Sequence, residues 1–314
     1  MKNQTFDFHF YLLPFGSNGN KNVILFTIFI LCYMICIIWN TIIVVLICTD
    51  SHLQTPMYFF LRNLSMVDIC YSSVTVPKLL DIFLTGDNSI SFDHCFVQYY
   101  FFTALACTEV FLLTVMAFDR YVAICKSLHY PIIMRSNTCI LLVVASWTSG
   151  CSNSLFLTIV ALKIPFCSST AIEQLFCDIK QMLKISCGNT MFIEVTVLLE
   201  ALFVGLCPFL CIMVSYLKII LNVLRLRSKG KWHKTFSTCA SHLTIITIFY
   251  GTICLVYMMP STAGFKTVAQ IFSSIFLAVI PSLNPLIYSL RNKDIIAAFK
   301  RFFFKNSSNV VWDE

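Results

Sequence analysis

Long apolar stretches separated by short polar segments dominate the chain between residues 23 and 290. A helix needs about 20 apolar residues to cross the ~30 Å hydrocarbon core of a bilayer. Seven stretches reach that length, at residues 23–48, 57–80, 99–118, 139–162, 191–221, 236–259 and 268–290. Helices are favoured over a barrel because lipid requires each backbone amide to be satisfied within its own segment. The pattern predicts an all-α membrane protein with a bundle of seven transmembrane helices.

The two ends of the chain are more polar than its middle, so the chain divides into three segments. Residues 1–22 predict an N-terminal tail without the features of a removable signal peptide. Residues 23–290 form the seven-helix domain, and residues 291–314 the remaining segment. Apolar and basic side chains alternate through residues 294–304 of that segment, as in a short amphipathic eighth helix lying on the membrane surface.

Composition agrees with a lipid environment, and the basic residues predict the orientation. Hydrophobic residues make up 58% of the chain and charged residues 12%, and the mean hydropathy is +0.81. Of the 22 basic residues, 15 fall on the face that holds the C-terminus, and this face is predicted to be cytoplasmic. Most of the net charge of +7 is therefore a topology signal and a surface for an acidic partner or anionic lipid, and nothing suggests nucleic acid.

The densest basic segment joins the fifth and sixth stretches. It contains no acid, and its basic residues are Arg225, Arg227, Lys229, Lys231 and Lys234. Each residue singly is a topology determinant, and the loop as a whole is a candidate contact surface for a cytoplasmic partner.

Cysteines and one sequon predict covalent features on the opposite, extracellular side. The 16 cysteines contain no pair of Cys-x-x-Cys units, which argues against a zinc site. Cys95, Cys167, Cys177 and Cys187 lie outside the lipid, where disulfides form, and sequence alone allows three pairings. Asn3 begins the one sequon, Asn3-Gln4-Thr5, that the glycosylation machinery could reach.

An acid and a guanidinium stand side by side at the end of the third stretch, where charge is expensive. The segment reads Met116-Ala117-Phe118-Asp119-Arg120-Tyr121-Val122-Ala123-Ile124-Cys125. An Asp-Arg-Tyr triplet at this place resembles the third helix of rhodopsin-like G-protein-coupled receptors, and the flanking residues narrow the resemblance to the odorant (olfactory) receptors of the tetrapod type. The alternative is an ion pair near the membrane surface without a switching role.

The resemblance to odorant receptors extends from the first helix to the last. Its remaining segments are Asn40, Thr55 to Leu61, Asn63-Leu64-Ser65 with Asp68, Leu128-His129-Tyr130-Pro131, Ser215-Tyr216, Lys234 to Leu243 and Pro281 to Asn292. The chain departs from the family pattern at Trp39, Ser127 and Gln181, where Gly, Pro and Pro are usual.

The resemblance implies a function and a set of roles. It implies a receptor of the plasma membrane, at the cilia of olfactory neurons, which binds a small hydrophobic odorant and activates a stimulatory olfactory-type G protein to raise cAMP. Arg120 would be held by Asp119 when the receptor is idle and would meet the G protein when it is active. Tyr216 and Tyr288 would swing inward on activation, aided by a kink at Pro285. The alternative for each tyrosine is an anchor with its hydroxyl in the headgroup region. The implied disulfides are Cys95–Cys177 and Cys167–Cys187.

Three polar side chains at mid-membrane depth are predicted to face one another. They are Asp68, Glu109 and Asn284, and a bare charge at that depth costs at least ~2.5 kcal/mol. Two interpretations fit: a sodium ion held at Asp68 and Glu109, as the resemblance implies, or a hydrogen-bonded cluster without an ion. No other cofactor or metal is expected.

The ligand is expected between helices three, five, six and seven, under the long outer loop. The predicted lining is mostly apolar with a few polar groups, and interhelical packing is the alternative for each position. Its members are Phe102, Thr103, Ala106, Cys107, Val197, Glu200, Ala201, Val204, Ile253, Tyr257, Ser274 and Leu277. Glu200 stands where the resemblance predicts an apolar residue; it would recognise a ligand amine or donor, or bond to a neighbouring helix or Lys180.

Other classes fit the sequence less well. A transporter or channel would also have several apolar stretches, but no internal repeat is found. A peptide or amine receptor is disfavoured by the short third inner loop and the Leu128 to Pro131 and Ser237 to Leu243 segments. An enzyme is not expected, because the chain has no nucleophile elbow, phosphate loop or metal-ligand spacing.

Overall fold

The computed structural model describes residues 8–15, 19–166, 170–225, 229–258 and 265–305. At positions 19–21, 229–238, 258, 266, 290–291 and 303–305 it describes the helix but not the side chains.

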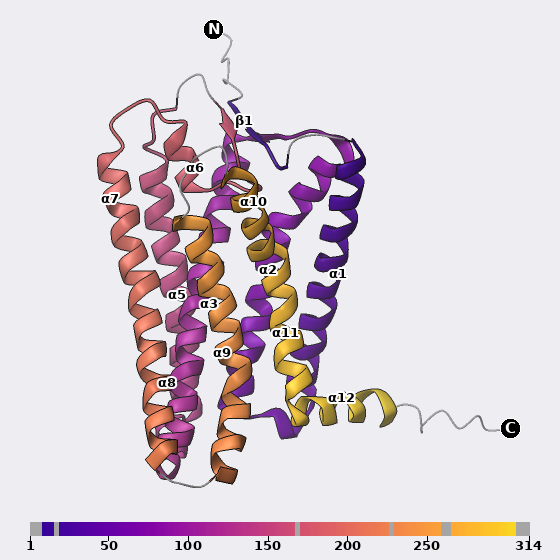
Figure 1. Ribbon diagram of the computed structural model, residues 1–314, viewed down its shortest axis with the longest axis vertical. Helices are drawn as coiled ribbons and strands as arrows, with labels where there is room; N and C mark the ends of the chain where they lie inside the picture. The colour runs from indigo at the N-terminus through magenta and orange to yellow at the C-terminus, as the bar shows by residue number, and fades with distance from the viewer. Residues whose placement is uncertain (1–7, 16–18, 167–169, 226–228, 259–264, 306–314) are drawn as a thin grey trace, which may run out of the picture.

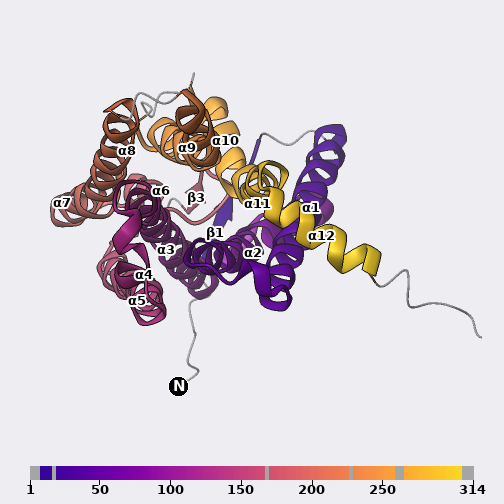
Figure 2. The same cartoon turned by 90° about the horizontal axis from the view of Figure 1, so that it is seen from below.

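Seven helical stretches stand side by side in a bundle, which confirms the predicted architecture (Figures 1 and 2). They are α1 (Gly19–Thr49), α2 (Pro56–Thr85), α3 (Phe92–Cys125), α5 (Ser136–Ala161), α7–η3–α8 (Met191–Glu200, Ala201–Leu206, Cys207–Arg225), α9 (Lys229–Met258) and α10–η5–α11 (Lys266–Ser274, Ile275–Val279, Ile280–Arg291). Six of them are long and apolar enough to span a membrane by themselves. The seventh, α2, carries four charged residues and is enclosed by its neighbours.

The expected amphipathic helix is α12 (Lys293–Lys305), which runs across one end of the bundle (Figure 1). We call this end the lower end and the opposite one the upper end. Short elements at the lower end are η1 (Ser51–Leu53), η2 (Ser127–His129) and α4 (Tyr130–Ile133). At the start of α12, Tyr58 Oη donates to Asn292 Oδ1 and Asp294 Oδ2, both at 3.0 Å.

The third membrane span, α3, is at the centre of the bundle, and the fifth span, α7–η3–α8, lies at its edge. In the most apolar 18 residues of each span, 61% of the residues of α3 are buried but only 11% of those of α7–η3–α8. Gly150 lets α5 approach α3 closely, because a β-carbon there would stand 2.7 Å from the carbonyl oxygen of Ala104. Small residues at helix contacts serve this purpose in membrane proteins.

Two helices contain a wider π-helical turn before a proline. The turns are η3, just before Pro208, and η5, just before Pro281. Proline lacks the N–H that a regular turn uses and crowds the preceding carbonyl, and a π-turn relieves this conflict. Pro285, where a kink is predicted, lies within α11, and the irregular turn of this helix is at η5.

A three-stranded sheet closes the upper end and is not predicted by the sequence pattern. Its central strand β1 (His9–Leu12) pairs antiparallel with β2 (Ser89–Ser91) and parallel with β3 (Ala171–Ile172). Gln270 Nε2 donates to the carbonyl oxygens of Leu13 at 2.7 Å and Glu173 at 3.3 Å. Part of the predicted N-terminal tail is thus folded into the cover of the bundle.

Candidate functional site

A cavity of about 460 Å³ lies among α3, α7, η3 and α9, below the short helix α6 (Ile179–Lys184). Ten of the twelve predicted lining residues border it: Phe102, Thr103, Ala106, Cys107, Val197, Glu200, Ala201, Val204, Ile253 and Tyr257. Phe249 and Phe276 add two further aromatic walls.

Ser274 and Leu277 are not among the lining residues, so the prediction for helix seven is not supported. Ser274 Oγ donates to the carbonyl oxygen of Gln270 at 2.8 Å, and Leu277 has no exposed surface. Leu277 belongs to the π-turn η5, whose wider winding turns side chains away from their positions on a regular helix. Phe276 therefore contributes to the cavity in place of Leu277.

Glu200 places a carboxyl group on this mainly apolar wall. Its Oε1 accepts from Asn153 Nδ2 of α5 at 3.4 Å, and the Cys107 thiol of α3 donates to the same oxygen at 3.8 Å. Bonding to neighbouring helices is thus observed, whereas Lys180 Nζ donates to the backbone carbonyl oxygen of Tyr257 at 2.8 Å. Glu200 is nevertheless a cavity residue, so its carboxyl group could also meet a ligand.

The outer loop covers the cavity and is tied down by a disulfide. Cys95 at the start of α3 is bonded to Cys177, with 5.6 Å between their α-carbons, as predicted. Cys187 also takes part in a disulfide, but Cys167 lies outside the described residues, so the second pairing stays a prediction. Asn3, the predicted glycosylation site, also lies outside the described residues.

Asp178 follows Cys177 directly and is a site residue that the sequence analysis missed. It is buried, borders the cavity, and its Oδ1 accepts from Tyr257 Oη at 3.1 Å. Burial raises the pKa of Asp178 to about 6, although the Tyr257 hydroxyl and the Lys180 ammonium act in the opposite direction. An acidic residue next to a predicted lid disulfide was the available signal.

The three polar residues at mid-depth meet as predicted. Asn284 Nδ2 lies 3.1 and 3.3 Å from the two carboxyl oxygens of Asp68 and 3.3 Å from Glu109 Oε1. All three side chains are buried, so α2, α3 and α11 are joined at one point. Among the described residues no group of three His, Cys, Asp or Glu is placed to hold a metal ion, and this cluster offers two acids with one amide.

The expected Asp119–Arg120 ion pair is not seen among the described side chains. Asp119 Oδ1 instead accepts from Tyr130 Oη, at the start of α4, at 2.8 Å. Neighbouring residues on a helix point about 100° apart and do not face each other, which explains why the pair is absent. Next along the chain, the ring of Tyr121 lies near two ammonium groups, those of Lys126 at 5.9 Å and Lys218 at 5.5 Å from the ring centre.

Arg120 lies near a buried polar group formed by Tyr216, His242 and Tyr288. Tyr216 Oη and His242 Nδ1 share a short hydrogen bond, and the rings of His242 and Tyr288 are 6.4 Å apart. Within the described part of the chain, Arg120 Nη2, His242 Nε2 and Tyr288 Oη have no hydrogen-bond partner. The two predicted switch tyrosines therefore both lie next to His242, a residue that the sequence motif contains but that was not predicted to belong to the switch.

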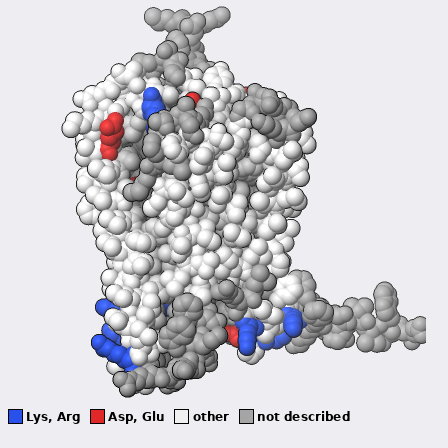
Figure 3. All heavy atoms as spheres, viewed as in Figure 1, with Lys and Arg blue, Asp and Glu red and all other residues white. Residues whose placement is uncertain are grey.

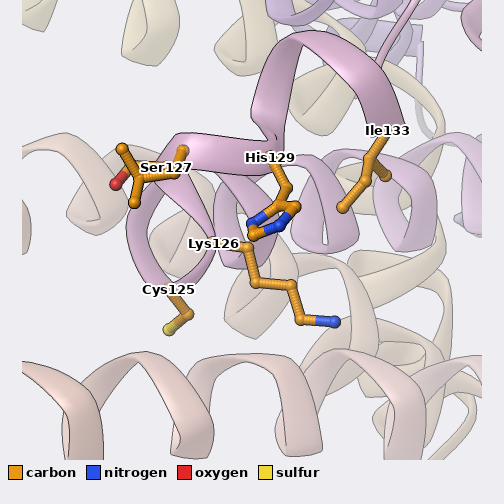
Figure 4. A pocket seen from close by; sticks show the side chains of 6 residues that line it. Cys125, Lys126, Ser127, His129 and Ile133 are labelled. Carbon is orange, nitrogen blue, oxygen red and sulfur yellow. The ribbon is translucent and has the colours of Figure 1, made fainter.

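A hollow of about 510 Å³ opens at the lower end of the bundle, at the segment that joins α3 to α5. It is lined by Cys125, Lys126, Ser127, Leu128, His129 and Ile133. The side chains of Lys126 and His129 extend into the same hollow (Figure 4). Leu128 is 90% exposed, so an apolar side chain stands free at the lower face beside these basic groups.

These features define a rhodopsin-like seven-helix receptor, with a covered cavity at the upper end and an Asp-Arg-Tyr segment at the lower end. The crystal structure of squid rhodopsin has the same fold, with a TM-score of 0.70 over 95% of this chain and 85% of that one at 16% identity. The olfactory receptor family model matches residues 29–306. The chain belongs to the olfactory receptor family, which is not a family of enzymes.

Curated relatives agree with this assignment. The mouse olfactory receptor 9S13 is 42% identical over 304 residues, covering 95% of this chain and 90% of the relative. The human olfactory receptor 7C1 is 42% identical over 299 residues, covering 95% and 93%. Odorant sensing through a G protein is the activity that membership of this family implies.

Proposed function

We propose that the chain binds a small volatile organic molecule in the upper cavity and activates a stimulatory, olfactory-type G protein through its lower face, raising cAMP. The observation that best supports this proposal is the covered cavity. Aromatic and aliphatic side chains make up most of its wall, and few polar groups interrupt them. Apolar sites of this kind bury most of a small ligand and orient it with a small number of polar contacts.

The proposed orientation places the upper end outside the cell and the lower end in the cytoplasm, with the receptor in the plasma membrane of olfactory cilia. Described Lys and Arg gather at the lower end of the visible face, on the foot of the bundle and on α12 (Figure 3). Cytoplasmic segments of membrane proteins carry an excess of such residues. The disulfide-bonded loop at the upper end also suits the oxidising, extracellular side.

Arg120 is the residue through which the lower face is proposed to act. Its guanidinium lies among side chains of α3, α8, α9 and α11, and its Nη2 atom has no hydrogen-bond partner in the described structure. Rearrangement of Tyr216 and Tyr288 would change its surroundings and expose it to the G protein. The free Leu128 and the basic hollow beside it offer further contacts.

A cAMP reporter screen against a chemically diverse odorant panel, with Arg120→Ala in parallel, tests the proposal. The wild type should respond to at least one odorant, and Arg120→Ala should lose about tenfold or more of that response at equal surface expression, as expected when a buried charged contact is removed. Lys300→Ala, which removes an exposed positive charge at the same end but outside the basic loop, is the matched control. An Arg120→Ala receptor that signals like the control would show that the assigned role is wrong.

A further inference from the structure

A second crevice at the lower end, separate from the cavity and from the switch, contains an unusual combination of side chains. Its volume is about 490 Å³, and it lies where the end of α1, the start of α2 and the start of α5 meet. The lining residues used below are Leu53, Thr55, Phe59, Arg62, Arg135 and Ile140.

Part of the crevice wall is apolar. Leu53 and two further lining residues, Met134 and Cys139, are buried. Ile140 is 51% exposed, and an exposed apolar side chain on a membrane helix faces lipid. The crevice is therefore open to hydrocarbon on one side.

Both charged residues of the crevice are positive. The guanidinium of Arg62 lies 5.1 Å from the centre of the Phe59 ring, and Arg135 is exposed directly before α5. Within the described residues neither arginine forms an ion pair, and no acid lines the crevice. The nearby Asp50 does not neutralise them, because it is bound by Arg301 at 2.6 Å.

Two helix starts add to the positive potential. Thr55 and Arg135 are the residues that precede α2 and α5, and neither makes a side-chain cap to its helix. α2 begins with Pro56, which has no N–H, so the first helical N–H group at the crevice is that of Ser136 in α5, and such groups attract anions. Arginine forks match phosphate oxygens well.

We propose that this crevice binds the headgroup of an anionic phospholipid. The phosphate would lie between Arg62 and Arg135, and the acyl chains would leave past Phe59 and Ile140 into the bilayer. Apolar walls open to hydrocarbon favour a lipid over a soluble phosphate. The leaflet concerned is the cytoplasmic one if the orientation proposed above holds, but binding itself depends on neither that orientation nor G-protein coupling.

The experiment uses the full-length receptor in nanodiscs of phosphatidylcholine with about 5 mol% phosphatidylinositol 4-phosphate, without G protein or odorant. Lipid retained on the extracted receptor is counted by native mass spectrometry. Arg62→Gln with Arg135→Gln should weaken retention about 25-fold, since each basic residue near an anionic surface contributes roughly fivefold. Lys218→Gln with Arg225→Gln removes the same charge from the same end, outside the crevice, and should retain the lipid as the wild type does.

A third variant separates lipid binding from folding. Ser136→Asp adds a negative charge at the crevice and also stabilises the start of α5, because acids are favourable at helix N-termini. It should fold at least as well as the wild type and still lose the lipid. Equal retention by the wild type and the Arg62/Arg135 double variant, or equal loss in both double variants, would overturn the proposal. Displacement of the lipid by soluble inositol phosphate would overturn the choice of a lipid.

Discussion

Glu200 supplies the cavity with a carboxyl group that a ligand could use. Its Oε1 is occupied by Asn153 and Cys107, which hold the side chain in place from two other helices. Asp178, Glu194 and Lys180 also border the cavity, so acids outnumber the one ammonium group there. An excess of carboxyl groups in an apolar site favours a ligand with an amine or another strong hydrogen-bond donor.

This residue gives a direct prediction about agonists found in the odorant screen. Glu200→Gln keeps the shape of the side chain and its contact with Asn153 but removes the charge. Glu200→Leu removes both the contact and the charge. For an amine agonist, both variants should lose about 10- to 100-fold in potency, since a hydrogen bond to a charged group is worth roughly 1.5–3 kcal/mol. A neutral agonist without a donor should keep its potency in Glu200→Gln. Dose–response curves at matched surface expression decide, and unchanged potency of every agonist in both variants would exclude Glu200 as a ligand contact.

At this scale the sequence predicts which residues are important better than it predicts their partners. Asp68, Glu109 and Asn284 meet because a polar group at mid-depth can be satisfied only by another one. Asp119 takes Tyr130 as its partner, and that contact depends on how the following loop folds back. Asp178 was missed because the only signal in the sequence is its position beside Cys177, and that position does not show that the acid will be buried.

The lid of the cavity is the element on which ligand binding depends most. It combines α6, the disulfide-bonded loop and the three-stranded sheet, which includes a strand from the N-terminal segment. Phe10 and Leu12 of β1 have no exposed surface, so this strand is packed into the lid. The cavity is therefore bordered by the outer loop and α6, and strands from three segments that are distant in sequence pack with this loop in one hydrophobic cluster.

The first prediction for the lid concerns its disulfide. Cys95→Ser or Cys177→Ser should free the loop from α3 and reduce surface expression strongly, because loss of a native disulfide costs roughly 2–5 kcal/mol in small secreted domains. Cys254→Ser, at an exposed free cysteine, is the control and should be expressed normally. Flow cytometry of surface receptor measures the effect, and wild-type expression of both lid variants would contradict the prediction.

The second prediction concerns pH. The pKa of Asp178 is about 6 in the folded protein, above the value of about 3.9 for an unfolded chain, so the folded lid binds its proton more tightly. The lid should therefore gain stability, on the order of 1–3 kcal/mol, as pH falls from about 7 to about 5, and lose it as pH rises through about 6. Tyr257 and Lys180 are the polar neighbours that limit this shift.

Amide hydrogen exchange of residues 170–185, corrected for intrinsic rates, measures the pH effect. Protection in the wild type should be greater at about pH 5.5 than at about pH 7.5. Asp178→Asn removes the titration and should make protection nearly independent of pH, while Asp87→Asn, an exposed loop acid, should behave as the wild type. A pH dependence that persists in Asp178→Asn would assign the effect to another group.

Elements were predicted well where lipid imposes a length, and poorly elsewhere. All seven spans lie where apolar stretches reach membrane length, although the helices extend several residues further at most ends. The sheet has strands of two to four residues whose partners come from distant segments, so no local pattern reveals it. The π-turn at η5 changes which face of helix seven meets the cavity, which a regular count cannot anticipate.

At the scale of the whole molecule, one buried network connects the helices that would move on activation. Asn40 Nδ2 of α1 donates to the carbonyl oxygen of Pro281 at 3.1 Å, next to the π-turn of helix seven. Three residues further along, Asn284 joins that helix to α2 and α3 through Asp68 and Glu109. This network lies between the cavity residue Phe276 and the switch residue Tyr288 in the chain, so a change in its bonding would be felt at both ends.

We propose that sodium binds at Asp68 and Glu109 and favours the inactive packing of this network. Two carboxyl groups that share one amide donor would gain from a cation between them. A ligand at about ten times its dissociation constant stabilises a protein by roughly 1.4 kcal/mol, enough to raise the melting temperature by a few degrees. Thermal unfolding should therefore be higher in about 150 mM sodium chloride than in potassium or choline chloride at equal ionic strength.

Asp68→Asn and Glu109→Gln should each abolish this difference and shift basal cAMP, since each removes one of the two negative charges. Asp81 lies near the upper end of α2, and its carboxylate forms an ion pair with Lys78. Asp81→Asn therefore removes a charge far from the cluster, should keep the sodium effect and serves as the control. Identical melting temperatures of the wild-type receptor in sodium and potassium would remove the case for an ion, and the three side chains would then be a hydrogen-bonded link between α2, α3 and α11 alone.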